Sequence, residues 1–420
     1  MMQSQATKNQ LLIPVLMITI IIDVMGVGLV FPIIPEIILS KSSLLFTPDT
    51  TDGVRNFYYG LTMAVWPFGV FIGSALIGRL SDIYGRKNML ILSLAGNVLS
   101  YLISVAALYS GSLSLFIISR LLCGFFGGSF SIAQAVILDI SNDENRVKNL
   151  SLVTLSASIG FIIGPLVTTL VGMLANTSAL AAELPFWFGA LLAFINVIFV
   201  WRLLSETFSP PKNKPKLKVL SLILSFRVMF IDKRIRLLAL SFLMLQIGWG
   251  YYAQSLPLLL DRVFHFSQSQ IGAFFIIFSL GFALSTLFVQ EAILKRFKTI
   301  SAMLFSAIIV TILIILSNLI ASAWMVAITA FFGSMFEIVF YTGILSLLSQ
   351  QVETHEQGAI MGGTSSVFGI AWFINAFSIG GVVAVNLLMP FYLAAIAIAI
   401  AGIFALLHGA YHQPSGQPHV

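Results

Sequence analysis

Long apolar runs of about 20 residues or more occupy most of this 420-residue chain, and few folds accommodate them. Every backbone polar group needs an internal partner in lipid, so only helices and closed barrels span a membrane. The runs are continuous, unlike the alternating ten-residue strands of a barrel, and therefore predict helices. We expect twelve of them, at about 11–39, 56–78, 88–109, 112–139, 148–172, 185–204, 235–260, 270–292, 300–319, 321–349, 358–384 and 388–410.

The composition excludes an ordinary water-soluble fold. Hydrophobic residues make up 58% of the chain and charged residues 9%, whereas a soluble domain carries about 25% charged residues. The net charge of +6 can indicate nucleic-acid binding, but the lysines and arginines lie between apolar runs, which favours a role in membrane topology. We therefore expect membrane lipid as a partner and no nucleic acid.

The longest polar interruption, residues 205–236, separates six runs from six others. We therefore predict an N-terminal six-helix bundle over 1–204, a basic cytoplasmic linker over 205–234, a C-terminal bundle over 235–411 and a tail over 412–420. With both termini in the cytoplasm, eighteen of the 22 lysines and arginines lie on the cytoplasmic side, as the positive-inside rule requires. The linker is interpreted as a solvated topogenic loop, with binding to acidic lipid or to a partner as the alternative.

The loop between the second and third runs carries the most specific motif, Gly78-Arg-Leu-Ser-Asp82-Ile-Tyr-Gly85-Arg86-Lys87. Gly78 is predicted to end one helix, and Gly85 permits a tight turn before the next. Asp82 can pair with an arginine or cap a neighbouring helix N-terminus. Such an ionic clasp can hold in one conformation and release in another, which predicts a gate.

Three ionisable residues lie deep within apolar runs, where each costs about 2.5–3.5 kcal/mol to insert and is by default a functional candidate. Asp23 and Glu337 are candidate proton carriers, because burial favours the neutral form of a carboxyl group. The alternative for Asp23 is a fixed structural acceptor of hydrogen bonds. Arg120 could hold a carboxylate, relay protons through water, bind an anionic substrate or make a structural pair.

Polar and aromatic side chains at the depth of the membrane are candidates for lining a substrate pocket, since an amide in lipid lacks partners. For any single aromatic residue, packing or lipid contact remains the alternative, because the chain contains 36 phenylalanines. The predicted pocket residues are Trp66, Gln134, Gln246, Trp249, Gln254, Tyr341, Trp372 and Asn375.

These motifs together resemble the major facilitator superfamily. The loop from Gly78 to Lys87 resembles its signature loop, and Arg120-Leu-Leu-Cys-Gly124 resembles its fourth-helix motif. By this resemblance Arg120 faces the central cavity and takes part in proton coupling. The segment 23–35, which begins at Asp23, is similar to the first helix of the drug–proton antiporters and in particular the tetracycline-resistance transporters. Gly160-Phe-Ile-Ile-Gly164-Pro165 resembles the fifth-helix antiporter motif, whose bend, by this resemblance, seals the cavity against leak.

Some positions depart from that pattern. Thr168 and Thr169 stand where the fifth-helix motif ends in a glycine pair, and residues 290–298 lack the glycine and aspartate of the signature loop. The ninth-helix carboxylate and eighth-helix histidine of the tetracycline transporters are missing, which puts tetracycline itself in doubt as a substrate.

The resemblance implies an all-α membrane protein with twelve transmembrane helices in two six-helix halves. The expected function is proton-coupled antiport, that is, efflux of small amphipathic molecules by a monomer in a bacterial inner membrane. The alternative is a proton symporter that imports a metabolite such as an amino acid, nucleoside or siderophore. The sequence shows no phosphate-binding loop, metal-ligand cluster or hydrolytic triad, so we expect neither an enzyme nor a cofactor, with the proton gradient as energy source.

Overall fold

The computed structural model describes residues 2–41, 43–141, 146–175, 177–207, 224–319, 322–352 and 354–411, and within these ranges it contains helices and no strand. Most of the predicted linker and the whole tail, 412–420, lie outside the described residues. The N-terminal helices are α1 (Met2–Ile34), η1 (Pro35–Leu39), α2 (Asp52–Tyr84), α3 (Arg86–Ser110), α4 (Leu113–Phe126), α5 (Ser129–Asp139), α6 (Arg146–Leu174) and α7 (Ser178–Leu203). The C-terminal helices are η2 (Leu224–Arg227), α9 (Val228–Ile231), α10 (Arg236–Arg262), α11 (Gln268–Leu284), η3 (Ser285–Val289), α12 (Gln290–Arg296), α13 (Thr299–Leu319), α14 (Ala323–Gln350), α15 (Thr354–Val385) and α16 (Met389–Tyr411).

The expected membrane spans correspond to these helices. Within the described residues, eleven segments are long and apolar enough to cross a bilayer. The twelfth expected span is α10, a helix of 27 residues whose side chains are largely buried. Its two glutamines, Gln246 and Gln254, lower its hydropathy relative to the others. The prediction of an all-α membrane protein is thus confirmed.

Helix boundaries follow local chemistry. The predicted fourth span, 112–139, is interrupted: α4 ends at Phe126 and α5 begins at Ser129, with Gly127 and Gly128 between them. Two consecutive glycines without side chains allow this break in an otherwise helical run. At the start of α11, Ser267 accepts a hydrogen bond from the Gln270 backbone while the Gln270 side chain accepts one from the Ser267 backbone, which forms a capping box.

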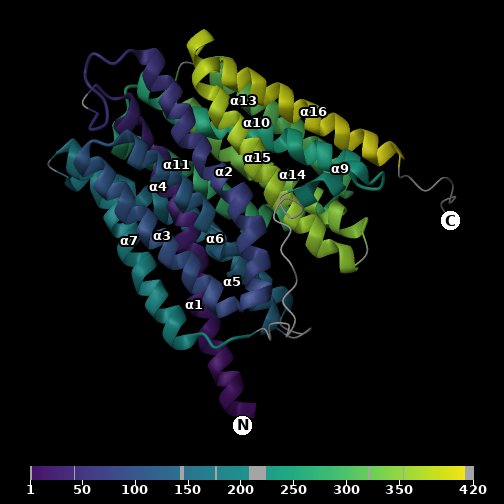
Figure 1. Ribbon diagram of the computed structural model, residues 1–420. Coiled ribbons are helices and arrows are strands. Elements are labelled where there is room, and N and C mark those ends of the chain that lie inside the picture. Colours follow the sequence, from purple (N-terminus) through teal and green to yellow (C-terminus); the bar gives the residue numbers. More distant parts are fainter. Residues whose placement is uncertain are drawn as a thin grey trace.

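The helices form two bundles with separate apolar cores. In the N-terminal half α1 packs on α6, α2 on α4 and α3 on α7, and in the C-terminal half α10 packs on α16 and α13 on α14. One core cluster contains buried residues from 229 onward, and two others draw mainly on residues before 205. Figure 1 shows the purple-to-teal half beside the green-to-yellow half.

Two helix pairs join the halves, α2 with α15 and α6 with α11. At the end opposite Met2 and Tyr411, here named the closed end, Arg262 Nη2 donates to Asn56 Oδ1 at 2.5 Å. The Tyr59 hydroxyl donates to the Gln254 carbonyl at 2.8 Å across the same junction. The halves meet at the closed end, at the top of Figure 1, and diverge toward the end that carries Met2 and Tyr411, here named the terminal end.

Candidate functional site

A cavity of about 310 Å³ lies between the two halves at the depth of the membrane. Helices α1, α2 and α6 contribute one wall, and α10, α11, α14 and α15 contribute the other. Aromatic rings dominate the lining: Trp249 stacks on Phe278 with ring centroids 5.6 Å apart, and Phe161 stacks on Phe282 at 5.7 Å. Such a surface accommodates an apolar or aromatic molecule, since most of a ligand's surface can be buried against it.

Glu337 supplies a carboxyl group to the wall of this cavity. It lies on α14 with 3% of its surface exposed, one helical turn before Tyr341, which also lines the cavity. Within the described residues no side chain donates a hydrogen bond or a positive charge to it. An ionised carboxylate in apolar surroundings without a partner is strongly unfavourable. This environment suits a group that exchanges a proton or receives a charge from a ligand.

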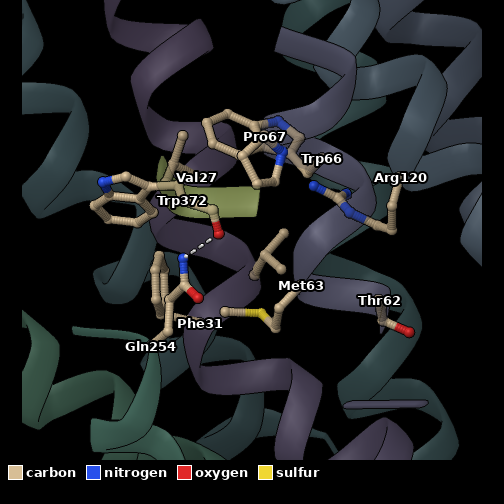
Figure 2. Close-up of a pocket in the computed structure, with 10 residues that line it drawn as sticks. Val27, Phe31, Thr62, Met63, Trp66, Pro67, Arg120, Gln254 and Trp372 are labelled. Atoms are coloured by element: carbon tan, nitrogen blue, oxygen red, sulfur yellow. Dashed lines mark hydrogen bonds between the residues drawn. The ribbon is translucent and has the colours of Figure 1, made fainter. Parts of the chain in front are cut away.

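A second, smaller cavity of about 30 Å³ adjoins the first on the side of α4. Val27, Phe31, Trp66 and Trp372 line both cavities, so the two lie side by side. Arg120 extends from α4 toward Trp66 in this smaller cavity (Figure 2). The smaller cavity therefore has the Arg120 guanidinium in its wall, from the N-terminal half, and the adjoining larger cavity has the Glu337 carboxyl group, from the C-terminal half.

Asp23 lies elsewhere, inside the N-terminal half, and lines neither of these cavities. Its Oδ2 accepts a hydrogen bond from Ser129 Oγ at 2.5 Å, and its Oδ1 accepts one from Asn97 Nδ2 at 3.2 Å. The carboxylate thus joins α1 to α3 and α5. This placement favours the structural interpretation of Asp23 over a proton carrier in the substrate path.

The predicted pocket residues divide into three groups. Trp66, Gln246, Trp249, Tyr341 and Trp372 line the central cavity, and Gln254 lines the smaller one together with Trp66 and Trp372. The structure brings neither Gln134 nor Asn375 to these two cavities; Asn375 donates to the Gln246 carbonyl at 3.2 Å and so ties α15 to α10. Sequence reasoning missed the lining phenylalanines, and no signal separates them from the packing ones. These are Phe31, Phe161, Phe275, Phe278, Phe282 and Phe368.

The signature loop forms an ionic cluster within the N-terminal half. Asp82 Oδ1 lies 2.8 Å from Arg86 Nη1, and Arg79 Nη1 lies 3.7 Å from Asp82 Oδ2. Arg86 Nε also donates to Asp139 Oδ2 at 3.3 Å, which ties the loop to the end of α5. The expectation that Gly78 ends a helix is wrong, because α2 continues to Tyr84.

The N-terminus of α3 is capped by a residue that sequence reasoning missed. Glu206 accepts hydrogen bonds from the backbone N–H of Arg86 at 2.8 Å and of Lys87 at 3.3 Å. Gly85, at φ +96°, makes the turn before α3, and its backbone lies so close to Glu206 that a Cβ would clash with that carboxylate. Lys87 Nζ donates to the Trp201 carbonyl at 2.8 Å. The loop is thereby attached to the end of α7.

The glycines of the fifth-helix motif place α6 directly against α1. A Cβ on Gly160 would lie 2.7 Å from the Ile21 carbonyl oxygen, and one on Gly164 would lie 2.7 Å from the Gly28 Cα. Backbone contact of this kind requires small residues. Pro165 follows and lines the central cavity, where the helix has lost one backbone hydrogen-bond donor.

Thr168 and Thr169, which replace the expected glycine pair, hydrogen-bond to the backbone beside Pro165. Both hydroxyls donate to the Pro165 carbonyl at 2.8 Å. The Thr169 hydroxyl also lies 3.4 Å from the Ser269 carbonyl of α11, across the junction between the halves. Thr169 therefore connects α6 to α11 at the closed end.

Comparisons with known proteins agree with this architecture. The family model described as Major Facilitator Superfamily matches residues 16–376 and 238–419. The chain is 24% identical over 357 residues to the tetracycline resistance protein, class C, of Escherichia coli, an alignment that covers 83% of this chain and 84% of that protein. It is 29% identical over 202 residues to the class H protein of Pasteurella multocida, covering 47% of this chain and 45% of that protein.

Solved structures share the fold at lower identity. The human organic anion transporter MFSD10 (TETRAN) superposes with a TM-score of 0.71 and 18% identity, covering 94% of this chain and 99% of that one. Similarity at this level supports the fold alone. With the family match over most of the sequence, the chain belongs to the Major Facilitator Superfamily and is a multi-pass membrane transporter, not an enzyme.

Proposed function

We propose that this chain is a proton-coupled antiporter that exports small amphipathic organic molecules across a bacterial inner membrane. The observation that carries the proposal is Glu337, a buried carboxyl group without a partner among the described residues, on the wall of an aromatic cavity. The relatives named as tetracycline resistance proteins are consistent with drug efflux. The protein acts as a monomer and uses the proton gradient, without a cofactor.

The proposed cycle starts from the conformation in which the two halves diverge at the terminal end. The excess of positive charge on that side supports a cytoplasmic location for it and for both termini. A substrate enters from the cytoplasm and lies against the aromatic rings, and its binding releases the proton from Glu337. Separation of the closed-end contacts between Arg262 and Asn56 then exposes the cavity to the outside, where Glu337 takes up a proton as substrate leaves.

The ionic cluster of the signature loop is the proposed gate at the cytoplasmic side. Asp82, Arg86 and Asp139 hold α2, α3 and α5 together at their cytoplasmic ends. These helices can therefore move as one body when the N-terminal half tilts toward the C-terminal half. In this account Asp23 stabilises that body from within and does not carry the transported proton.

A vesicle experiment tests the proposal. Purified full-length protein is placed in liposomes that contain a pH-sensitive dye, and tetracycline, cationic dyes and metabolites are added on either side under an imposed proton gradient. Antiport predicts that substrate and protons move in opposite directions. The Glu337→Gln variant is expected to abolish substrate-driven proton movement, whereas Glu291→Gln, which removes an exposed carboxylate paired with Lys295 on α12, leaves it intact.

The outcome also decides the alternative. A symporter that imports a metabolite moves substrate and protons in the same direction, and that result rejects export. Proton movement of wild-type magnitude in Glu337→Gln removes this carboxyl group from the mechanism.

A further inference from the structure

Arg120 is fully buried yet lacks the hydrogen bonds that a buried arginine requires. It is 1% exposed, and its Nε and Nη1 atoms have no acceptor among the described residues. Its neighbour within α4 is the Cys123 thiol, one turn further along, which is a weak acceptor. No carboxylate of the described residues lies within ion-pair distance of the guanidinium.

Arg55 shows how this fold satisfies a buried arginine when the role is structural. It is also 1% exposed, but its Nη1 donates to the carbonyls of Ile38 at 3.2 Å and Ser40 at 2.7 Å. Its Nη2 donates to the Thr47 carbonyl at 2.8 Å, and its Nε to the Thr50 carbonyl at 3.3 Å. Arg55 closes a loop, whereas Arg120 has donors directed at no such set of carbonyls.

The unpartnered donors of Arg120 belong to a cavity that also contains an unpartnered acceptor. Gln254 reaches the same cavity from α10, and its Nε2 donates to the Trp372 carbonyl at 3.4 Å (Figure 2). Its Oε1 is buried without a donor. The cavity volume of about 30 Å³ is two or three times the roughly 10–15 Å³ that one water needs, so it holds a group of carboxylate size.

We infer that this smaller cavity is a subsite for the anionic group of the transported substrate. An acidic group placed there receives charge-assisted hydrogen bonds from Arg120, and a neighbouring N–H or O–H of the substrate can donate to Gln254. The apolar body of the same molecule extends past Phe31 and Trp372 into the aromatic cavity. The substrate class is therefore an aromatic or amphipathic acid or zwitterion. This inference rests on the proposed function in one respect, that the molecule bound in the subsite is the one transported.

A matched pair of dyes tests the subsite. Rhodamine 110 carries a carboxylate, and rhodamine 123 is its methyl ester with the same ring system. Binding to full-length protein in lipid nanodiscs is followed by fluorescence anisotropy, with binding to empty nanodiscs subtracted. The subsite predicts that the wild type binds rhodamine 110 at least about tenfold more tightly than the ester, from hydrogen bonds to a charged group.

Two variants assign that preference to Arg120. Arg120→Gln is expected to remove it while the ester still binds, and Arg120→Lys to retain part of it because the charge remains. Equal binding of the two dyes to the wild type, no binding of rhodamine 110, or a preference that survives Arg120→Gln overturns the inference.

A third variant keeps the test decisive if Arg120→Gln does not fold. Gln254→Glu retains Arg120 but adds a carboxylate to the same small cavity, and it is expected to weaken rhodamine 110 binding at least about tenfold through repulsion and competition for the guanidinium. Unchanged rhodamine 110 binding in that variant contradicts the inference. If Glu337→Gln still prefers rhodamine 110 over the ester and the wild type shows no substrate-driven proton movement, the proposed antiport is refuted. The subsite inference stands in that case.

Discussion

The closed-end contacts offer a direct way to shift the conformation of this transporter. The hydrogen bond from Arg262 to Asn56 has a charged donor, and the hydrogen bond from Tyr59 to the Gln254 carbonyl joins two neutral groups. Such bonds contribute about 1.5–3 and 0.5–1.5 kcal/mol, respectively. Replacing Asn56 by Leu and Tyr59 by Phe should therefore cost the closed-end state about 2–4.5 kcal/mol in total. That moves the equilibrium between the two conformations by roughly 30- to 1,600-fold toward opening at this end.

Spin-label distance measurements detect the shift. The native Cys123 is buried, so cysteines introduced at the exposed positions Asp49 and Val263 can be labelled selectively at the closed end of the two halves. The double variant should populate longer distances than the wild type. Tyr58→Phe, which removes the hydroxyl of the adjacent residue, is the matched control and should leave the distribution unchanged. Identical distributions for the double variant and the wild type would refute the assignment of these bonds as the closing contacts.

Three further substitutions, the first with a matched control, test the packing and the loop. Gly164→Ala should lower the free energy of unfolding by about 1–3 kcal/mol, because the added methyl group overpacks against α1. The control Gly381→Ala, at a position with open space around it, should not lower it. Thermal unfolding in detergent compares the two variants, and equal midpoints would contradict the close contact of α6 with α1. Ser129→Ala removes the short bond to Asp23 and should cost about 1.5–3 kcal/mol in the same assay, with an unchanged midpoint as the opposing result. Glu206→Ala uncaps α3 and should cost about 0.5–2 kcal/mol, seen as faster hydrogen exchange at the start of α3; wild-type protection there would argue against a cap.

The fold could be predicted from sequence because the membrane imposes one dominant rule. Runs of apolar residues must become helices, and basic residues between them set the topology. The rule fails where helices are interrupted, as at Gly127 and Gly128, because lipid depth alone does not say where a run breaks. Nor does the rule predict that Arg55 is buried, with its guanidinium enclosed by backbone carbonyl groups.

The site could be predicted only in part. Asp23 and Glu337 give the same signal in sequence, an acid within an apolar run, but their surroundings differ. Asn97 and Ser129 come from other helices to bind Asp23, and nothing in the spacing of the chain announces those partners. Glu337 was identified by that same signal, and the structure leaves it without a partner among the described residues.

The cavity-lining phenylalanines could not be predicted for a similar reason. Each is one of 36, and the choice between lipid, core and cavity depends on how two bundles meet. Glu206 was missed because it follows α7, far in sequence from the helix that it caps.

The central claim is that the charge of Glu337 couples substrate movement to protons. The most direct test uses a compound that the vesicle screen finds to be transported, and compares accumulation against a gradient with simple exchange of labelled for unlabelled compound. We expect Glu337→Gln to retain exchange, because the cavity and both conformations remain, and to lose accumulation driven by the proton gradient. A Glu337→Gln protein that still accumulates substrate like the wild type would contradict the account.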